Sequence, residues 1–186
     1  LKQADIALYK AKESGRNQYR FYTSELNRDA HMMMSLRQSV KASVEEDFNI
    51  VFQPWFSARS GTIIGIEALT RWNTDAGNNV SPSVFIKQIE ESGLITDFSR
   101  WLFDEVFRQS QQWREQLENG LKVSINLSER QFLNDELTDE IIRLVRKYNL
   151  NASWFVLEVK EKALLADPDK AAVALDSLAR QGFSIH

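Results

Sequence analysis

Three polar residues stand where apolar segments of the chain end, and their types suit a bound metal ion. Glu67 follows residues 63–66, Asn126 follows residues 123–125, and Glu158 follows residues 155–157. Carboxylate and amide oxygens are hard donors of the kind that bind Mg²⁺, Mn²⁺ or Ca²⁺. If the three side chains converge, they form a metal site suited to phosphoryl chemistry. The alternative is that these groups only begin loops and cap helices, and spacing alone leaves both interpretations open.

The composition of the chain limits the chemistry that it can perform. Its 186 residues include no cysteine and two histidines, His31 and His186. This excludes disulfide scaffolds, thiolate zinc sites and cysteine nucleophiles, and it disfavours a Ser-His-Asp triad. A hydrophobic fraction of 43% is ample for a packed core. Catalysis is therefore expected to rest on carboxylates, amides and metal.

Charge and hydropathy patterning indicate where the protein works. The formal net charge of −3 argues against non-specific binding to DNA, RNA or an anionic membrane. No apolar run approaches the roughly 20 residues of a membrane span, and no signal peptide opens the chain. We therefore expect a cytoplasmic protein with no membrane contact in this segment.

The elements that must position the three polar residues alternate between strand and helix from residue 48 onward. We expect strands at residues 49–56, 62–72, 121–127, 154–159 and 183–186, with a loop at residues 75–81. We expect helices at residues 84–93, 94–117, 138–148 and 169–180. This order predicts a mainly parallel sheet with helical crossovers, in which the carboxyl ends of the strands form the functional edge.

Two architectures fit this alternation, a complete open α/β sheet and a (β/α)8 TIM-like barrel truncated after about half. Residues 48–186 are too few for a whole barrel, which needs roughly 250 residues. No helix follows the last expected strand, and we therefore favour the truncated barrel.

The first part of the chain has a different character. Residues 1–22 read as a helix that stops at Gly15 and a short aromatic strand, too little to bury a core alone. We expect them to be the tail of an upstream domain. Residues 23–47 are expected to form a helical linker, whose methionines at 32–34 pack in part. Residues 48–186 form the main domain, which we expect to be incomplete at its C-terminus.

Six ordered motifs in the main domain resemble those of EAL domains, the cyclic di-GMP phosphodiesterases. They include Glu67-Ala68-Leu69, continuing to Trp72, and Asn126-Leu127-Ser128, followed by Gln131 and Phe132. The other matching segments are residues 52–54, 81–86, 90–95 and 157–161. Upstream, residues 4–12 and 15–21 resemble the end of a GGDEF domain, the diguanylate cyclase type.

The resemblance implies an EAL-type (β/α)8 barrel with one antiparallel strand, and it implies a role for each matching residue. The implied metal ligands are Glu67, Asn126 and Glu158, for two Mg²⁺ or Mn²⁺ ions in the complete domain. The implied substrate contacts are Gln53, Leu69 and Arg71, with Arg71 on a phosphate. Glu161, grouped with Glu67 and Glu158 in the implied catalytic set, would hold the loop after the β-strand that ends at Val159. The implied reaction is hydrolysis of cyclic di-GMP to linear pGpG, in a homodimer.

Two departures from the family pattern bear on activity. Lys160 stands where the family usually carries threonine, and its ammonium would compete with the metal if it approached Glu158; otherwise it faces solvent. The family's Asp-Asp-Phe-Gly motif is expected shortly after His186, and later Lys, Glu and Gln residues of the site would follow it. We therefore expect this chain alone to be inactive.

The departures leave two alternatives to a phosphodiesterase. One is a degenerate EAL domain that binds cyclic di-GMP as a receptor without cleaving it. The other is a structural half-barrel that self-associates, for which the aromatic helix expected at residues 94–117 would supply exposed apolar surface.

Overall fold

The computed structural model describes residues 3–4, 7–8, 11, 17, 19, 21–24, 48–73 and 79–186. The chain divides into two units, Leu1–Ser43 and Val44–His186, and each is considered by itself. In the first unit, Ala7 and Ala11 are buried, and the rings of Tyr19 and Phe21 meet edge to face at 5.4 Å. The methionines at 32–34 and most of the expected linker lie outside the described residues. The predicted domain boundaries stay predictions.

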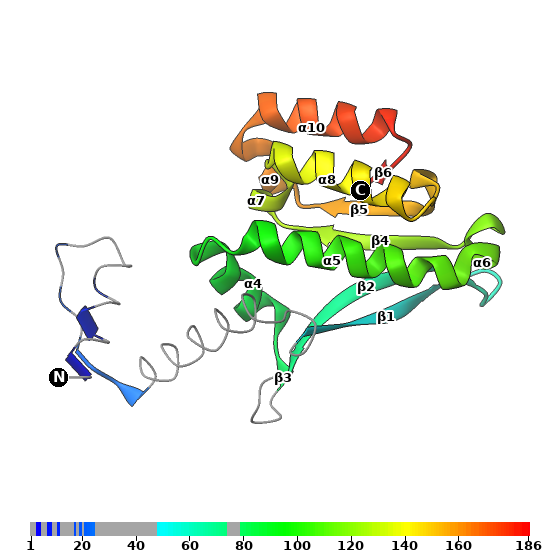
Figure 1. Cartoon of the computed structure of the whole chain (residues 1–186). Coiled ribbons are helices and arrows are strands. Elements are labelled where there is room, and N and C mark those ends of the chain that lie inside the picture. The colour runs from blue at the N-terminus through cyan, green and yellow to red at the C-terminus, as the bar shows by residue number, and fades with distance from the viewer. Residues whose placement is uncertain are drawn as a thin grey trace. The chain divides into compact units, whose positions relative to one another are not determined.

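One mixed sheet organises the second unit (Figure 1). Its strand order is β1-β2-β4-β5-β6, and β3 pairs with β2 off this path. β1 and β3 run antiparallel to β2, whereas β2, β4, β5 and β6 are parallel. The strands are β1 (Phe48–Phe56), β2 (Ile63–Asn73), β3 (Asn79–Val80), β4 (Lys122–Leu127), β5 (Phe155–Val159) and β6 (Ser184–Ile185). The expected mainly parallel sheet is confirmed, and β3 lies entirely within the segment expected to be a loop, residues 75–81.

Helices cover one face of this sheet (Figure 1). They are α4 (Pro82–Glu91), α5 (Ile95–Ser110), α6 (Arg114–Glu118), α7 (Glu129–Phe132), α8 (Asp135–Lys147), α9 (Glu161–Ala166) and α10 (Pro168–Arg180). Two 3₁₀ turns, η1 (Gln111–Trp113) and η2 (Ala152–Trp154), complete the set in the described part of the chain. The sequence pattern predicted neither α7 nor α9.

The single helix expected at residues 94–117 is wrong. α5 ends at Ser110, and the η1 turn separates it from α6. The Ser110 hydroxyl donates to the carbonyl of Val106 at 2.7 Å, a bond that competes with regular helix geometry. The turn lets the Trp113 ring meet Phe52 of β1 edge to face at 4.6 Å. Tertiary packing therefore sets this break.

Aromatic side chains fill the space between the sheet and its helices. Phe48 of β1 stacks on Trp72 of β2 at 5.8 Å and meets Phe98 of α5 at 5.4 Å. Further along α5, Phe107 meets Phe155 of β5 at 4.6 Å. Because Phe98 and Phe107 are fully buried, the aromatic residues of α5 build the core. They do not form the exposed apolar surface on which the self-association alternative depends.

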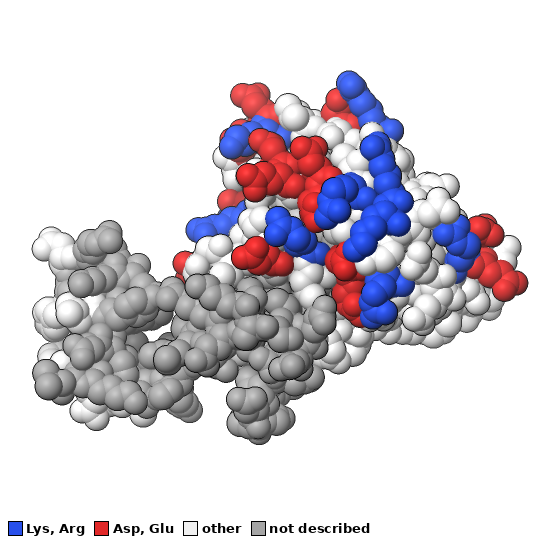
Figure 2. All heavy atoms as spheres, in the orientation of Figure 1, with Lys and Arg blue, Asp and Glu red and all other residues white. Residues whose placement is uncertain are grey.

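The outer surface of the helix layer is highly charged. Figure 2 shows Lys and Arg interspersed with Asp and Glu over the helices. No helix in the described ranges is long and apolar enough to cross a membrane.

Candidate metal and phosphodiester site

Strand β2 presents the first candidate residues on the face that the helices leave open. Ala68, Thr70 and Trp72 point into the helix-covered core and are buried. The residues between them therefore point to the opposite face, since side chains alternate along a strand. Glu67, Leu69 and Arg71 all occupy this face and are half-buried. The EAL-like segment thus combines core and site residues in a single strand.

Glu67 and Asn126 meet directly, although they are 59 residues apart in sequence. The amide nitrogen Nδ2 of Asn126 donates to Oε1 of Glu67 at 2.7 Å. Glu158 of β5 is the register partner of Asn126 and therefore lies beside it on the same face. β2, β4 and β5 are adjacent and parallel: Asn126 and Glu158 lie toward the carboxyl ends of β4 and β5, and Glu67 lies in the middle of β2, in the stretch that pairs with β4. The structure thus brings together the three predicted metal ligands.

The donor set fits a hard divalent cation. Asn126 uses its nitrogen on Glu67, so its Oδ1 remains as an oxygen donor beside two carboxylates. Hard cations such as Mg²⁺ select oxygen donors of this kind. Within the described ranges, no group of three or more His, Cys, Asp or Glu side chains could hold a metal. The site therefore depends on the amide of Asn126 as its third donor.

The predicted substrate-contacting residues line the neighbouring part of the same face. Gln53 of β1 is exposed and lies opposite Glu67 in the antiparallel register. Leu69 and Arg71 follow Glu67 along β2, and Arg71 Nη1 donates to the carbonyl of Thr70 at 3.1 Å. The guanidinium is thus held at the carboxyl half of β2. The structure groups all three residues with Glu67.

Glu161 and Lys160 lie just beyond the sheet. Lys160 is the N-cap residue of α9 and Glu161 is its first residue, and both are exposed. Among the described residues, Lys160 forms no ion pair with Glu158 and Glu161 forms none at all. A neighbouring pair, Lys162 and Glu129 at 3.2 Å, joins α9 to α7. The role predicted for Glu161 stays a prediction, and the structure favours the solvent-facing alternative for Lys160.

Sequence reasoning missed the buried polar contacts behind Asn126. Gln131 of α7 accepts a hydrogen bond from the backbone nitrogen of Ser128 at 2.8 Å and donates to Ser99 of α5 at 2.7 Å. The pattern Ser-x-x-Gln at residues 128–131 is a helix-start signal that could have located α7. The partner on α5 could not be read from the sequence.

A hollow of about 510 Å³ lies at the other end of the sheet. Its lining includes Ile63 and Ile66 at the start of β2, Leu121 just before β4, and Phe52 and Trp113. Ile63 and Leu121 lie at the amino ends of β2 and β4, and Ile66 points to the face of β2 opposite that of Glu67, because side chains alternate along a strand. The hollow is therefore separate from the candidate site.

A comparison with family models assigns the chain to a family. The model described as EAL domain matches residues 35–186. The chain belongs to the EAL domain family. The expected EAL-type α/β class is confirmed, and the described sheet is consistent with part of a TIM-like barrel. The GGDEF tail expected upstream of the EAL domain stays a prediction.

Named relatives of this EAL domain act in cyclic di-GMP signalling. The bifunctional diguanylate cyclase/cyclic di-GMP phosphodiesterase MucR of Pseudomonas aeruginosa is 32% identical over 183 residues, which cover 98% of this chain and 27% of that protein. The cyclic di-GMP phosphodiesterase PdeR of Escherichia coli is 29% identical over 187 residues, covering 100% of this chain and 28% of PdeR. The chain thus spans about a quarter of the length of these relatives.

A solved structure resembles this EAL domain. It is the MucR phosphodiesterase in complex with cyclic di-GMP, with a TM-score of 0.76 and 30% sequence identity. The match covers 83% of this chain and 62% of that chain.

Proposed function

We propose that the protein hydrolyses cyclic di-GMP to linear pGpG at the open face of this EAL domain. The observation that carries the proposal is the contact between Asn126 and Glu67, with Glu158 beside them in register. Three hard oxygen donors thus lie side by side on adjacent parallel strands, two of them toward the carboxyl ends, where α/β proteins carry their sites. The names of MucR and PdeR support the same activity.

The residues divide into ligands and substrate contacts. Glu67, Asn126 and Glu158 would hold Mg²⁺ or Mn²⁺, and the hydrogen bond from Asn126 would fix the orientation of the Glu67 carboxylate. Two such ions, when bound, supply an activated water and stabilise charge on the attacking and leaving oxygens. Arg71 would bind a phosphate through its planar guanidinium, which matches phosphate oxygens in a bidentate manner.

The remaining assignments complete the proposal. Gln53 and Leu69 would contact the dinucleotide from β1 and β2, and Glu161 would hold the loop that follows β5. We propose that the protein works in the cytoplasm as a homodimer, and that it does not bind DNA or RNA polymers.

One feature favours a second candidate, a receptor that binds cyclic di-GMP without cleaving it. Lys160 places a cation two residues after Glu158, where the family pattern has threonine. A positive charge near a metal ligand would weaken binding of a divalent cation. Its exposed position and the lack of an ion pair with Glu158 among the described residues favour the phosphodiesterase.

The substitution Glu67→Gln in the full-length protein tests the proposed function. It removes one ligand charge at nearly constant volume, at a half-buried position outside the helix-covered core. Loss of a residue that supports a metal ligand typically lowers activity roughly 10- to 100-fold. Because Glu67 is itself a proposed ligand, we expect pGpG formation to fall by more than this. Chromatography of the nucleotide products measures turnover, and calorimetry measures Mn²⁺ affinity.

A matched control uses the same chemical change elsewhere. Glu136 is an exposed glutamate in the first turn of α8, and Glu136→Gln should leave both turnover and Mn²⁺ affinity unchanged. Equal turnover in Glu67→Gln and the wild type would overturn the site. Wild-type protein that binds cyclic di-GMP with Mn²⁺ present and yields no pGpG would establish the receptor instead.

A further inference from the structure

A chain of hydrogen bonds runs from helix α5 to the end of strand β4 through the protein interior. Ser99 of α5 donates from Oγ to the carbonyl of Ile95 at 2.5 Å. Gln131 of α7 donates from Nε2 to Ser99 Oγ at 2.7 Å, and its Oε1 accepts from the backbone nitrogen of Ser128 at 2.8 Å. Ser99 is 0% and Gln131 is 3% exposed. We call Ser99 and Gln131 the amide relay.

The direction of each bond in the amide relay follows from the donors available. A serine hydroxyl carries one hydrogen, and Ser99 uses it on the carbonyl of Ile95. Toward Gln131 the hydroxyl can therefore only accept, so it must face the amide nitrogen. This orientation turns Oε1 of Gln131 toward Ser128. Ser99 thus determines which atom of the Gln131 side chain holds the backbone.

The held backbone lies next to the candidate site. Ser128 follows Leu127, the last residue of β4, and is two residues from Asn126. Asn126 is exposed, and its side-chain amide donates to Glu67. The backbone that leads out of β4 is therefore fixed from the buried side, whereas the amide that it carries faces the open side.

We propose that Gln131 is a positioning residue for Asn126. The inference rests on the proposed function, in which Asn126 is a metal ligand. The amide relay anchors the end of β4 to α5, a helix whose Phe98 and Phe103 side chains are fully buried. A buried amide bonded on both sides resists displacement, because leaving either partner unsatisfied costs free energy. The hydrogen bonds to α5 thereby fix the position of Asn126 relative to Glu67.

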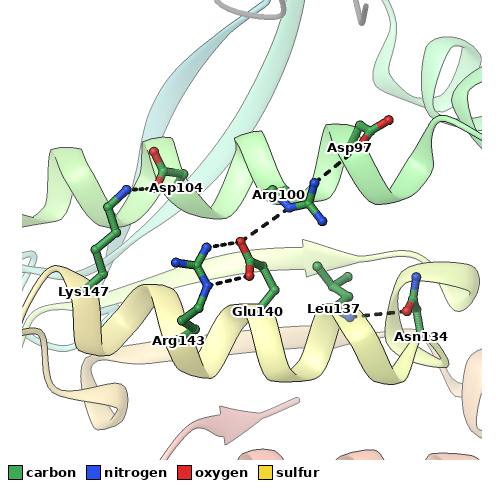
Figure 3. A network of polar contacts seen from close by, with 8 residues as sticks. All are labelled: Asp97, Arg100, Asp104, Asn134, Leu137, Glu140, Arg143 and Lys147. Carbon is green, nitrogen blue, oxygen red and sulfur yellow. Dashed lines mark hydrogen bonds and ion pairs between the residues drawn. The ribbon is translucent and has the colours of Figure 1, made fainter.

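The chain contains a natural control with the same chemistry. Asn134 also accepts from a backbone nitrogen, that of Leu137 at 3.3 Å (Figure 3), and donates to a hydroxyl on α5, that of Thr96 at 3.1 Å. It begins α8 rather than following β4. Asn134→Ala therefore removes one bond to a backbone nitrogen and one bond to α5, as Gln131→Met does, without releasing the residues next to Asn126.

The test compares three variants of the full-length protein. Gln131→Met keeps the length of the side chain and removes both bonds, and it should weaken Mn²⁺ binding and lower kcat by about tenfold. The KM for cyclic di-GMP should stay within about twofold, since Gln53, Leu69 and Arg71 are not displaced. Ser99→Ala removes only the outer anchor and should give a smaller change in the same direction. Asn134→Ala should lower thermal stability alone.

Hydrogen exchange provides a readout that does not depend on catalysis. Amides of residues 126–128 should exchange faster in Gln131→Met and Ser99→Ala than in the wild type, and at the wild-type rate in Asn134→Ala. Equal exchange, Mn²⁺ affinity and kcat in Gln131→Met and Asn134→Ala would overturn the positioning role. If wild-type protein neither binds Mn²⁺ nor forms pGpG, the proposed function fails, and unchanged exchange at residues 126–128 would overturn the amide relay separately.

Discussion

The two faces of the sheet are built from alternate residues of the same strands, yet they serve different purposes. The helix-covered face is aromatic and closed, with Phe48, Trp72 and Phe98 in mutual contact. The open face carries Glu67 and Asn126. The amide nitrogen of Asn126 contacts Glu67, which leaves the amide oxygen available as a metal ligand. Along β2, residues of the packed core therefore alternate with residues of the proposed site. Substitutions on the two faces should therefore separate stability from metal binding.

The largest effect is expected from Phe98→Ala on the covered face. Phe98 of α5 is fully buried, where it contacts Phe48 of β1 and Phe85 of α4. Removing its ring leaves a cavity and should lower the free energy of unfolding by about 3–5 kcal/mol. Val51→Ala, at a 37% exposed position on the open face, should cost less than about 1 kcal/mol. Chemical denaturation measures both, and equal costs would remove the distinction between the faces.

An intermediate effect is expected where the open face is itself tightly packed. A methyl group on Gly65 would lie 2.7 Å from Cε3 of Trp55 and 3.2 Å from the carbonyl of Lys122. Gly65→Ala should therefore destabilise the protein by about 1–3 kcal/mol through overpacking. Combining Gly65→Ala with Trp55→Ala should reduce this loss of unfolding free energy, because the Trp55 indole is nearer to the added methyl group than the Lys122 carbonyl is.

Gly61 supplies the control for this interpretation. It has a φ of +68°, with nothing within 4 Å of an added Cβ. Gly61→Ala should cost free energy through backbone strain alone, and Trp55→Ala should not change that cost. Coupling between Trp55 and Gly61 as large as that between Trp55 and Gly65 would contradict the packing argument.

The sequence predicted the strands because they depend on short-range patterns. Each of the three polar residues follows an apolar segment, and parallel strands bring their carboxyl ends to one edge, so the pattern allowed Glu67 and Asn126 to converge across 59 residues, as the structure shows. Their role as metal ligands came from the family resemblance and stays a prediction. The antiparallel β1 came from the family resemblance rather than from the pattern.

Hydrophobic periodicity could not predict the short helices, although the Ser-x-x-Gln pattern at residues 128–131 marks the start of α7, and no local pattern could predict the amide relay. α7 has four residues and α9 has six, too few for a helical period to be visible. Tertiary contacts hold them, such as the hydrogen bond between Gln131 and Ser99 and the ion pair between Lys162 and Glu129. These contacts depend on how α5 faces the sheet, which no local pattern specifies.

The smallest effect is expected on the outer surface of the helix layer, which faces solvent and does not contact the sheet. Glu140 of α8 accepts from Arg143 Nε at 2.8 Å and Nη2 at 2.5 Å, and its Oε1 lies 3.5 Å from Arg100 Nε of α5 (Figure 3). The hydrogen bonds from Arg143 hold the pKa of the Glu140 carboxyl below its ordinary value of 4.5. The ionised carboxylate is therefore stabilised by folding.

This shift fixes the sign of a pH dependence. The stabilisation is fully present above the ordinary pKa, and it is lost as the pH falls through the lower pKa of the folded state. Glu140→Gln should lower the free energy of unfolding at pH 7 by at most about 1 kcal/mol, because water and salt screen an ion pair at the surface. The difference from the wild type should shrink as the pH is lowered from 5 to 3. Urea denaturation at several pH values measures it, and a difference that persists at pH 3 would show that Glu140 acts through packing rather than charge.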